Sequence, residues 1–366
     1  MKIGIDAQAS KGRLTGLGVY TKNLIQFLLA QQRNGFEFVL ISREQKGDWN
    51  TAERLLWENA EVPRQARRGR IGILHVPAFS PPLIKPCRVV VTVHDLIGMF
   101  FANQLGWPSR FYWGKWLPLT VRKADAIIAD SENTKKDIVE HLQVPEARVK
   151  VIYPSGHEGF SPHQEPAALK RTRERFGIKE KYFLTVGTLE PRKNLLRTIE
   201  AFSQFLKTSK SDATFQLVVV GSIDFAHGKF LKILLENCKL DSDDVILTGY
   251  VEQEDLNMLY SGAEGFVFAS LYEGFGIPVL EAMASGAPVI TSRSSSLPEV
   301  AGDAAAYVDP CDVSAIANGM CDIASNSTLR KQLVEKGFER IKHFSWRDTA
   351  NKTLEVYESL ESGGVA

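Results

Sequence analysis

The sequence predicts an α/β protein built from two doubly wound units in tandem, each with a parallel sheet covered by helices. At 366 residues the chain exceeds what one hydrophobic core usually organises. Short apolar runs alternate with amphipathic helical patterns, which is typical of parallel sheets with helices on both faces. A segment rich in Pro, Gly and polar residues, 154–166, divides this alternation into two series.

The first series contains six candidate strands: Lys2–Asp6, Glu37–Ile41, Gly72–His75, Val89–Val93, Ala126–Ala129 and Val149–Ile152. Helical patterns lie between them near Gly18–Gln31, Pro108–Lys123 and Asn133–Leu142. Ser131 stands where an N-cap of the last helix is expected. These elements predict a first domain over residues 1–153.

The second series contains five candidate strands: Tyr182–Val186, Gln216–Val220, Val245–Leu247, Gly265–Phe268 and Pro288–Thr291. It predicts a second domain over residues 167–345, joined to the first by the linker 154–166. A further helical pattern, about 346–361, ends the chain.

Charge is distributed unevenly along the chain. Residues 1–153 carry 22 basic and 14 acidic side chains, whereas the remainder carries 22 basic and 29 acidic ones. A basic first half suggests an anionic partner, although scattered surface charge is an equal alternative. No apolar run approaches the roughly 18 residues of a membrane span, so we expect none.

The segment Glu273–Glu281 is the most informative part of the sequence. Gly265–Ala269 upstream reads as a buried strand, Pro278 fits the first turn of a helix running to about Ser285, and Gly286 fits its end. A strand, a glycine turn and a helix N-terminus create an anion site. Glu273 would lie in the loop beside the anion and Glu281 one turn into the helix, an arrangement that suits a nucleotide sugar.

Two further glycine-containing turns favour phosphate contacts. Gly16 and Gly18 follow the first strand, and a helix starting after Gly18 would offer its N–H groups to a ligand. Thr21 replaces the third glycine of a dinucleotide fingerprint, which argues against NAD or FAD.

The second turn contains Gly187 and Thr188, and the adjacent cations Arg192 and Lys193 follow it at the start of a helix. Cations there oppose the helix dipole unless an anion binds. Without a metal ion, these two cations can stabilise a leaving diphosphate.

His94 closes a buried-looking strand, so its ring should point into the crevice where open α/β sheets bind ligands; a hydrogen-bonded core histidine is the alternative. Asp95 beside it is more typical of a cap.

The segment Trp107–Lys123 mixes aromatic and basic residues and fits either an interfacial membrane segment or a helix that packs its rings into the first domain. Gly114 and Pro118 weaken a continuous helix there. Near-neutral net charge and the lack of a recognised module argue against nucleic acid.

Three stretches carry a family resemblance: Leu247–Val251, Ala263–Glu281 and Ser296–Asp303. With two glutamates separated by seven residues, they resemble the retaining family 4 glycosyltransferases. The resemblance implies the GT-B fold, in which two Rossmann-like domains face a cleft and the last helix crosses back to the first domain. It also implies that the first domain binds the acceptor and the second the nucleotide sugar.

The resemblance assigns roles to individual residues. It implies a catalytic set of His94, Glu273, Arg192 and Lys193. It implies a donor-binding set of Gly16, Gly18, Gly187, Thr188, Gly221, Tyr250, Val251, Gly274, Phe275, Gly276, Ile277 and Glu281. Many family members carry arginine where this chain has Thr188, so Arg192 and Lys193 are expected to hold the diphosphate alone.

The resemblance to bacterial mannosyltransferases of surface polysaccharide assembly implies GDP-mannose as donor, a lipid-linked glycan as acceptor, and no metal or other cofactor. The departing diphosphate would take the acceptor's proton inside the closed cleft. We expect a cytoplasmic protein, peripheral on the inner membrane and attracted by its anionic surface. The alternatives are a UDP-sugar-dependent transferase, an epimerase of nucleotide sugars on the same scaffold, and a catalytically silent nucleotide-sugar sensor.

Overall fold

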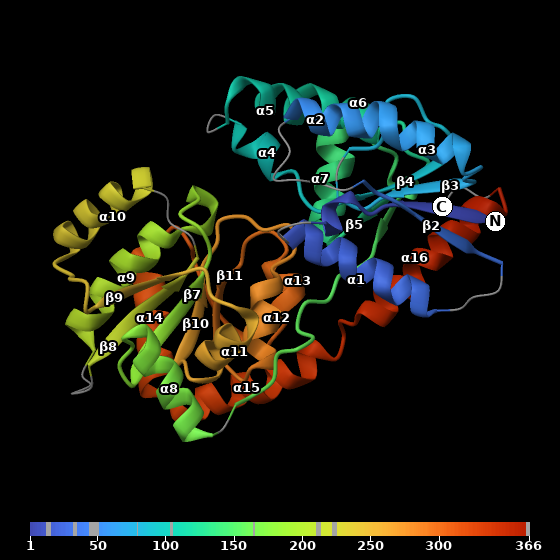
Figure 1. Ribbon diagram of the computed structural model, residues 1–366. Helices are drawn as coiled ribbons and strands as arrows, with labels where there is room; N and C mark the ends of the chain where they lie inside the picture. Colours follow the sequence, from blue (N-terminus) through green and yellow to red (C-terminus); the bar gives the residue numbers. More distant parts are fainter. Residues whose placement is uncertain are drawn as a thin grey trace. The chain divides into compact units, whose positions relative to one another are not determined.

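A computed structural model describes residues 1–11, 16–31, 35–43, 51–78, 80–102, 105–163, 165–209, 214–221 and 225–363 (Figure 1). The chain divides into two compact units. The first comprises Met1–Pro154 together with Phe344–Ala366, and the second comprises Ser155–His343. Each has one six-stranded sheet in which all named strands pair in parallel.

The first unit's sheet has the order β2-β1-β3-β4-β5-β6. Its strands are β1 (Lys2–Asp6), β2 (Glu37–Ile41), β3 (Ile73–Val76), β4 (Arg88–Val93), β5 (Ala126–Ala129) and β6 (Val149–Val151). All six were predicted, with ends that shift by at most one residue. Its helices are α1 (Gly16–Ala30), α2 (Thr51–Leu56), α3 (Val62–Arg68), α4 (Ile97–Phe100), α5 (Trp107–Phe111), α6 (Leu117–Val121), α7 (Glu132–Leu142) and α16 (Trp346–Glu361).

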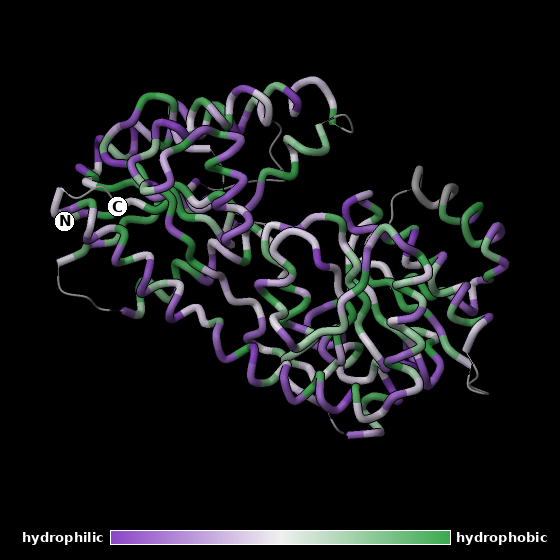
Figure 2. Tube along the Cα trace, turned by 180° about the vertical axis from the view of Figure 1, so that it is seen from behind, coloured by the Kyte–Doolittle hydropathy of each residue, from purple (hydrophilic) through white to green (hydrophobic). Residues whose placement is uncertain are grey.

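Helices cover both faces of this sheet (Figure 1). On one face, α1 and α16 bury Leu24 and Tyr357 against strand residues such as Ile3. On the other, α2, α3, α6 and α7 enclose a core that includes Trp57 and Val91. Figure 2 shows hydrophobic residues concentrated along the central strands, as burial of both faces of a parallel sheet requires.

The C-terminal helix returns to the first unit, as the resemblance implied. His75 Nδ1 lies 2.6 Å from the hydroxyl of Tyr357 on α16, and His75 Nε2 lies 2.9 Å from Thr92 Oγ1. Complete burial lowers the pKa of His75 to about 3, so the ring is neutral and pairs with two hydroxyls. This buried polar chain fastens α16 to the sheet.

Two helices of the first unit differ from expectation. Helix α1 begins at Gly16 instead of after Gly18, and Thr21 Oγ1 donates to the Leu17 carbonyl one turn earlier, so both glycines belong to the helix rather than to a loop. Thr15, which directly precedes Gly16, lies outside the described residues. Between α5 and α6 the chain stays helical through a π-helical stretch, Tyr112–Trp116, in which the Leu117 N–H bonds the Tyr112 carbonyl. The wider turn contains Gly114 and leads into Pro118 without breaking the helix.

The second unit's sheet has the order β12-β11-β10-β7-β8-β9. Its strands are β7 (Lys181–Val186), β8 (Phe215–Val220), β9 (Val245–Gly249), β10 (Gly265–Phe268), β11 (Val289–Ser292) and β12 (Ala305–Val308). Its helices are α8 (Pro166–Phe176), α9 (Leu195–Thr208), α10 (Phe225–Cys238), α11 (Gln253–Ser261), α12 (Ile277–Ala284), α13 (Leu297–Ala301), α14 (Val313–Ser325) and α15 (Ser327–Ile341). Strand β12 was not predicted, because its two alanines leave Val308 as its one β-branched residue.

The expected linker belongs to the second unit. The Ser161 N–H donates to Asn257 Oδ1 at 3.3 Å, and the His163 N–H donates to Ser261 Oγ at 3.1 Å. Ser161 and His163 therefore pack on α11, and residues 155–166 of the expected linker belong to the compact second unit. Among the described residues, no helix is long and apolar enough to cross a membrane.

Candidate active site

The strand order of the second unit locates a crevice. The chain builds β7, β8 and β9 outward in one direction and then returns to the other side of β7 with β10. In open parallel sheets, the carboxyl ends of two strands that flank such a reversal form the ligand-binding crevice. The loop after β7 carries Arg192 and Lys193, and the loop after β10 carries Glu273.

These three side chains form one ion-pair cluster, which we call the Arg–Lys–Glu cluster. Arg192 Nη1 lies 3.0 Å from Glu273 Oε2, and Lys193 Nζ lies 2.8 Å from Glu273 Oε1. The side chain of Glu273 is only 8% exposed, and those of its partners are 17% and 16% exposed. Low solvent exposure strengthens these charge-assisted hydrogen bonds.

The backbone around Glu273 is held from two sides. Its N–H donates to Ser295 Oγ at 2.8 Å, and Ser296 Oγ donates to the Glu273 carbonyl at 2.9 Å. The Leu271 N–H donates to the Arg192 carbonyl at 2.7 Å, which joins the two loops. The carboxylate is therefore positioned by backbone contacts as well as by its ion pairs.

Glu190 adds a second carboxylate at the rim of the cluster. Arg192 Nε donates to Glu190 Oε2 at 2.7 Å, and Thr188 Oγ1 donates to Glu190 Oε1 at the same distance. Partial burial raises the pKa of Glu190, but the Thr188 hydrogen bond and the charge of Arg192 outweigh it, so the net pKa is lowered. Thr188 stands at the position where the resemblance leads one to expect arginine. Its hydroxyl holds the Glu190 carboxylate, which in turn pairs with Arg192.

The turn before α12 has the backbone that the glycine pattern predicted. Gly276 adopts φ +115° as the N-cap of α12, a conformation that side-chain-bearing residues rarely reach. Phe275 is buried, and its carbonyl accepts from Ser296 Oγ at 2.7 Å. Gly274 lies in the same turn, and Ile277 packs so closely on Gly156 that a Cβ there would lie 2.4 Å from Ile277 Cγ2.

Glu281 lies one turn into α12 and is partly buried. It accepts a hydrogen bond from the Tyr260 hydroxyl at 3.0 Å. Desolvation raises the pKa of Glu281 to about 7, against the opposing influence of the Tyr260 hydrogen bond and the Lys193 charge. The group is therefore poised to change charge near neutral pH.

The remaining predicted donor residues of the second unit follow the carboxyl ends of neighbouring strands. The Gly187 N–H donates to the Val220 carbonyl, and the Gly221 N–H donates to the Gly249 carbonyl, each at 2.9 Å. A Cβ on Gly221 would lie 2.2 Å from the Gly187 carbonyl oxygen, so only glycine fits. Beyond Gly249, Tyr250 is largely exposed and Val251 is buried.

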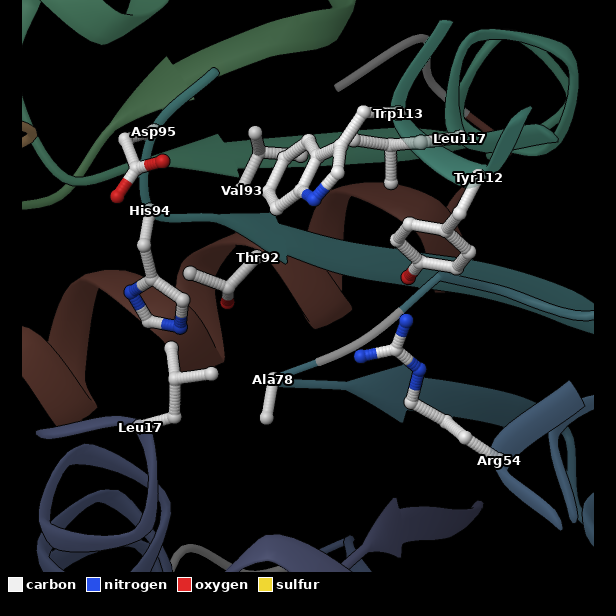
Figure 3. Close-up of a pocket in the computed structure, with 10 residues that line it drawn as sticks. All are labelled: Leu17, Arg54, Ala78, Thr92, Val93, His94, Asp95, Tyr112, Trp113 and Leu117. Carbon is white, nitrogen blue, oxygen red and sulfur yellow. The ribbon is translucent and has the colours of Figure 1, made fainter. Parts of the chain in front are cut away.

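The first unit has its own cavity at the carboxyl ends of its strands, with a volume of about 210 Å³. Figure 3 shows His94 and Leu17 on one side, Tyr112 and Arg54 on the other, with Trp113 between them. The guanidinium of Arg54 lies 4.1 Å from the centre of the Tyr112 ring. A Cβ on Gly98 would lie 2.1 Å from the Trp113 ring, so only glycine at 98 leaves room for the indole.

His94 borders this cavity, and both of its ring nitrogens face acceptors. Nδ1 lies 2.5 Å from Asp130 Oδ2, and Nε2 lies 2.7 Å from the Pro77 carbonyl. Burial lowers the pKa of His94, but the Asp130 charge and both hydrogen bonds together raise it by more than burial lowers it. The net pKa is therefore above its usual range. Both ring protons are thereby engaged, and the ring contributes positive charge more readily than a hydrogen bond to a ligand. Asp95 accepts from the Ile97 N–H at 2.9 Å, the turn expected of a cap.

Sequence reasoning missed Asp130, Arg54 and Tyr112. Asp130 directly follows β5 just as His94 follows β4, and their shared strand-end position was the available signal. Arg54 and Tyr112 lie on helices whose long side chains reach the cavity, and no local pattern marks them. Trp113, considered for a membrane segment, instead lines the cavity, and Trp116 packs against the first unit's core.

Within the described part of the chain, no three His, Cys, Asp or Glu side chains gather in a group that could hold a metal ion. Asp241, in an acidic run, accepts from the N–H groups of Asp243 and Asp244, so its carboxylate closes a turn.

Two family models match the chain. Residues 169–340 match "Glycosyl transferases group 1", and residues 14–155 match "Glycosyltransferase Family 4". The chain is 29% identical to the O-antigen chain mannosyltransferase B of Escherichia coli, over 98% of this chain and 100% of that protein. It is 30% identical to the serotype-specific mannosyltransferase WbdA of Escherichia coli over 75% of this chain, which spans about a third (34%) of the longer relative.

Among solved structures, the fold is similar to that of a sucrose-phosphate synthase from Thermosynechococcus elongatus. The TM-score is 0.76 with 19% identity, over 99% of this chain and 100% of that one. At that identity the likeness shows the fold alone, and it agrees with the two parallel six-stranded sheets described above.

Proposed function

The chain belongs to the family 4 glycosyltransferases of GT-B fold, and we propose that it transfers mannose from GDP-mannose to a lipid-linked glycan in surface polysaccharide synthesis. The similarity to an O-antigen chain mannosyltransferase and to a serotype-specific mannosyltransferase supports this sugar and this process. A UDP-sugar donor is the alternative for the same reaction.

The Arg–Lys–Glu cluster is the observation that carries the proposal. Transfer from a sugar diphosphate requires stabilisation of the negative charge that develops on the leaving group. Arg192 and Lys193 supply two cations at a strand-end crevice, and Glu273 holds both in position. An incoming diphosphate would compete with Glu273 for these cations. The Glu273 carboxylate, freed from its ion pairs, could then turn toward the sugar.

The His94 cavity of the first unit suits the acceptor. Trp113 and Tyr112 offer aromatic walls, and Arg54 offers hydrogen-bond donors, the combination that binds a sugar ring with its hydroxyl groups. His94, held charged by Asp130, would contribute positive potential beside the reacting sugar.

We propose that the reaction retains configuration and needs no metal. The departing diphosphate would take the acceptor's proton, while Arg192 and Lys193 neutralise the charge that a metal neutralises in other transferases. Activity should survive EDTA. Loss of activity with EDTA, restored by Mn²⁺ or Mg²⁺, would contradict this assignment.

A donor screen tests the proposal. The purified protein is incubated with GDP-mannose, UDP-glucose or another UDP-sugar, with and without a lipid-linked oligosaccharide, and the nucleotide released is measured. We expect GDP only when GDP-mannose and acceptor are both present. A new sugar isomer formed from the donor alone would support an epimerase, and ligand binding without turnover would support a sensor.

We further propose that the protein acts at the cytoplasmic face of the inner membrane. Trp107 is 78% exposed, and Phe111 on the next turn is also exposed. Arg110 and Lys115 are exposed on the same helical segment. Exposed aromatic residues with cations suit an anionic lipid surface, to which each nearby cation contributes about 1 kcal/mol.

Sedimentation with vesicles tests the membrane assignment. Binding to vesicles containing phosphatidylglycerol should exceed binding to neutral vesicles and fall steeply with salt. Trp107→Ser should weaken it, whereas Leu247→Ser, which removes an exposed apolar side chain from β9, should not. If the wild-type protein ignores anionic vesicles at low salt, the acceptor is soluble and this helix is an ordinary surface element.

A further inference from the structure

A second cavity of the first unit lies at the amino ends of its strands. Its volume is about 280 Å³, and four basic side chains line it: Lys85, Arg88, Lys123 and Arg148. Leu360 and Gly363, at the end of α16, complete the wall. Arg88 begins β4, whereas His94 follows the end of that strand. The cavity is therefore separated from the His94 cavity by the length of the sheet's strands.

The single carboxylate in this cavity is already used. Lys85 Nζ lies 2.6 Å from Asp125 Oδ1, and the Val89 N–H donates to Asp125 Oδ2 at 2.7 Å. Over the ranges that the structure describes, no carboxylate lies within ion-pair distance of Arg88, Lys123 or Arg148. Three cations thus share one concave site, and their mutual repulsion favours an anion between them.

Backbone contacts fix part of this set. Arg148 Nη1 donates to the carbonyls of Arg122 at 3.0 Å and Ala124 at 3.2 Å, and Lys123 Nζ approaches the Leu83 carbonyl at 3.4 Å. A guanidinium has five N–H donors, so one held at Nη1 keeps others for an oxyanion. A fixed guanidinium is matched to the paired oxygens of a phosphate group.

We propose that Arg88, Lys123 and Arg148, with Lys85, form a binding site for a phosphate group, carried either by an anionic phospholipid headgroup or by a soluble phosphate compound. The site is distinct from the donor and acceptor sites proposed above, because it lies at the opposite edge of the sheet. Ile84, 72% exposed and adjacent to Lys85, provides an apolar contact of the kind a lipid would use.

Two probes distinguish the sources: inorganic pyrophosphate, followed by calorimetry, and vesicles of phosphatidylglycerol and phosphatidylcholine, followed by sedimentation. The test variant is Arg88→Gln/Lys123→Gln. The matched control is Arg67→Gln/Arg68→Gln, which removes the same charge from exposed positions of α3 in the same unit. Circular dichroism of each variant checks folding, and Lys123→Gln alone serves if the double variant does not fold.

We expect the test variant to bind its probe about thirtyfold more weakly, since two cations near an anion each contribute roughly one kcal/mol. The control should bind like the wild type. If the wild type binds vesicles but not pyrophosphate and the test variant loses vesicle binding, the phosphate group belongs to a lipid. If the wild type binds pyrophosphate and the test variant loses that binding, the phosphate group belongs to a soluble compound. Equal weakening in test and control variants would reduce the site to diffuse surface charge. Failure of the wild type to bind either probe would overturn the proposal.

Discussion

Lys193 Nζ lies 2.8 Å from Glu273 Oε1, so a cation expected to hold the diphosphate is paired with the carboxylate expected to position the sugar. The two residues lie 80 positions apart in sequence, on the loops after β7 and β10. Their contact means that the two roles are coupled: a change at one residue alters the charge and orientation of the other.

Glu273→Gln should lower turnover more than donor affinity. The amide keeps the shape but removes the charge that positions the sugar in the transition state, while Arg192 and Lys193 become freer to bind diphosphate. We expect kcat to fall on the order of 10²-fold with KM for the donor unchanged or lower. Glu190→Gln, which removes a rim partner of Arg192, is the control and should have a smaller effect. Equal kinetics in wild type and Glu273→Gln would remove Glu273 from the mechanism.

Arg192→Ala and Lys193→Ala should each lower the rate roughly 10²–10³-fold, as expected for loss of a preorganised charge at a leaving group. Lys207→Ala, in the last turn of α9, removes an equal charge outside the cluster and should leave steady-state kinetics unchanged. Because each cation contacts Glu273, the double variant should lose less than the product of the single losses. A full product would show that the cations act independently.

Donor affinity should rise with pH through about 7 because of Glu281. Its ionised form is the better acceptor for a ribose hydroxyl, and its pKa is raised to about 7. Glu281→Gln should bind the donor more weakly at pH 8 and lose this pH dependence, as calorimetry can measure, while Glu264→Gln should keep it. The raised pKa also predicts that the wild type's free energy of unfolding falls between pH 4.5 and 7 relative to that of Glu281→Gln, since only the unfolded state releases the proton there.

Asp130→Asn should lower the pKa of His94, because it removes the charge that keeps the ring protonated. NMR titration of the ring measures this shift directly. A histidine pKa raised in the folded state stabilises the protein below about pH 6.5, and this stabilisation disappears as pH rises through the folded value. The variant should therefore lose more stability at pH 6 than at pH 9, whereas Asp322→Asn on α14 should lose little at either. An unchanged His94 titration would contradict the ion pair.

The elements that could be predicted are those with local signals. Strands such as β4 consist of consecutive β-branched residues, and the start of α12 is marked by Gly276 and Pro278. The contacts of Asp130 with His94 and of Glu273 with Lys193 depend on which strands lie side by side, and that order is set by the whole chain. The resemblance predicted separate roles for Arg192, Lys193 and Glu273. That these side chains pair with one another is visible only in the structure. The roles of Gly16 and Gly18 in donor binding stay a prediction, and both glycines lie in the first turn of α1 instead of in a loop.

The return of α16 determines the order in which the protein can mature. Trp346, Leu354 and Tyr357 are buried in one of the two cores that flank the first sheet, yet they are synthesised after the whole of the second unit. Residues 155–343 are complete before them, so on the ribosome the second unit can fold while one face of the first sheet is covered by α1 but not yet by α16. The unit whose translation begins first is thus completed after the second unit, and a chain released before residue 344 would contain all of the second unit but only part of the first.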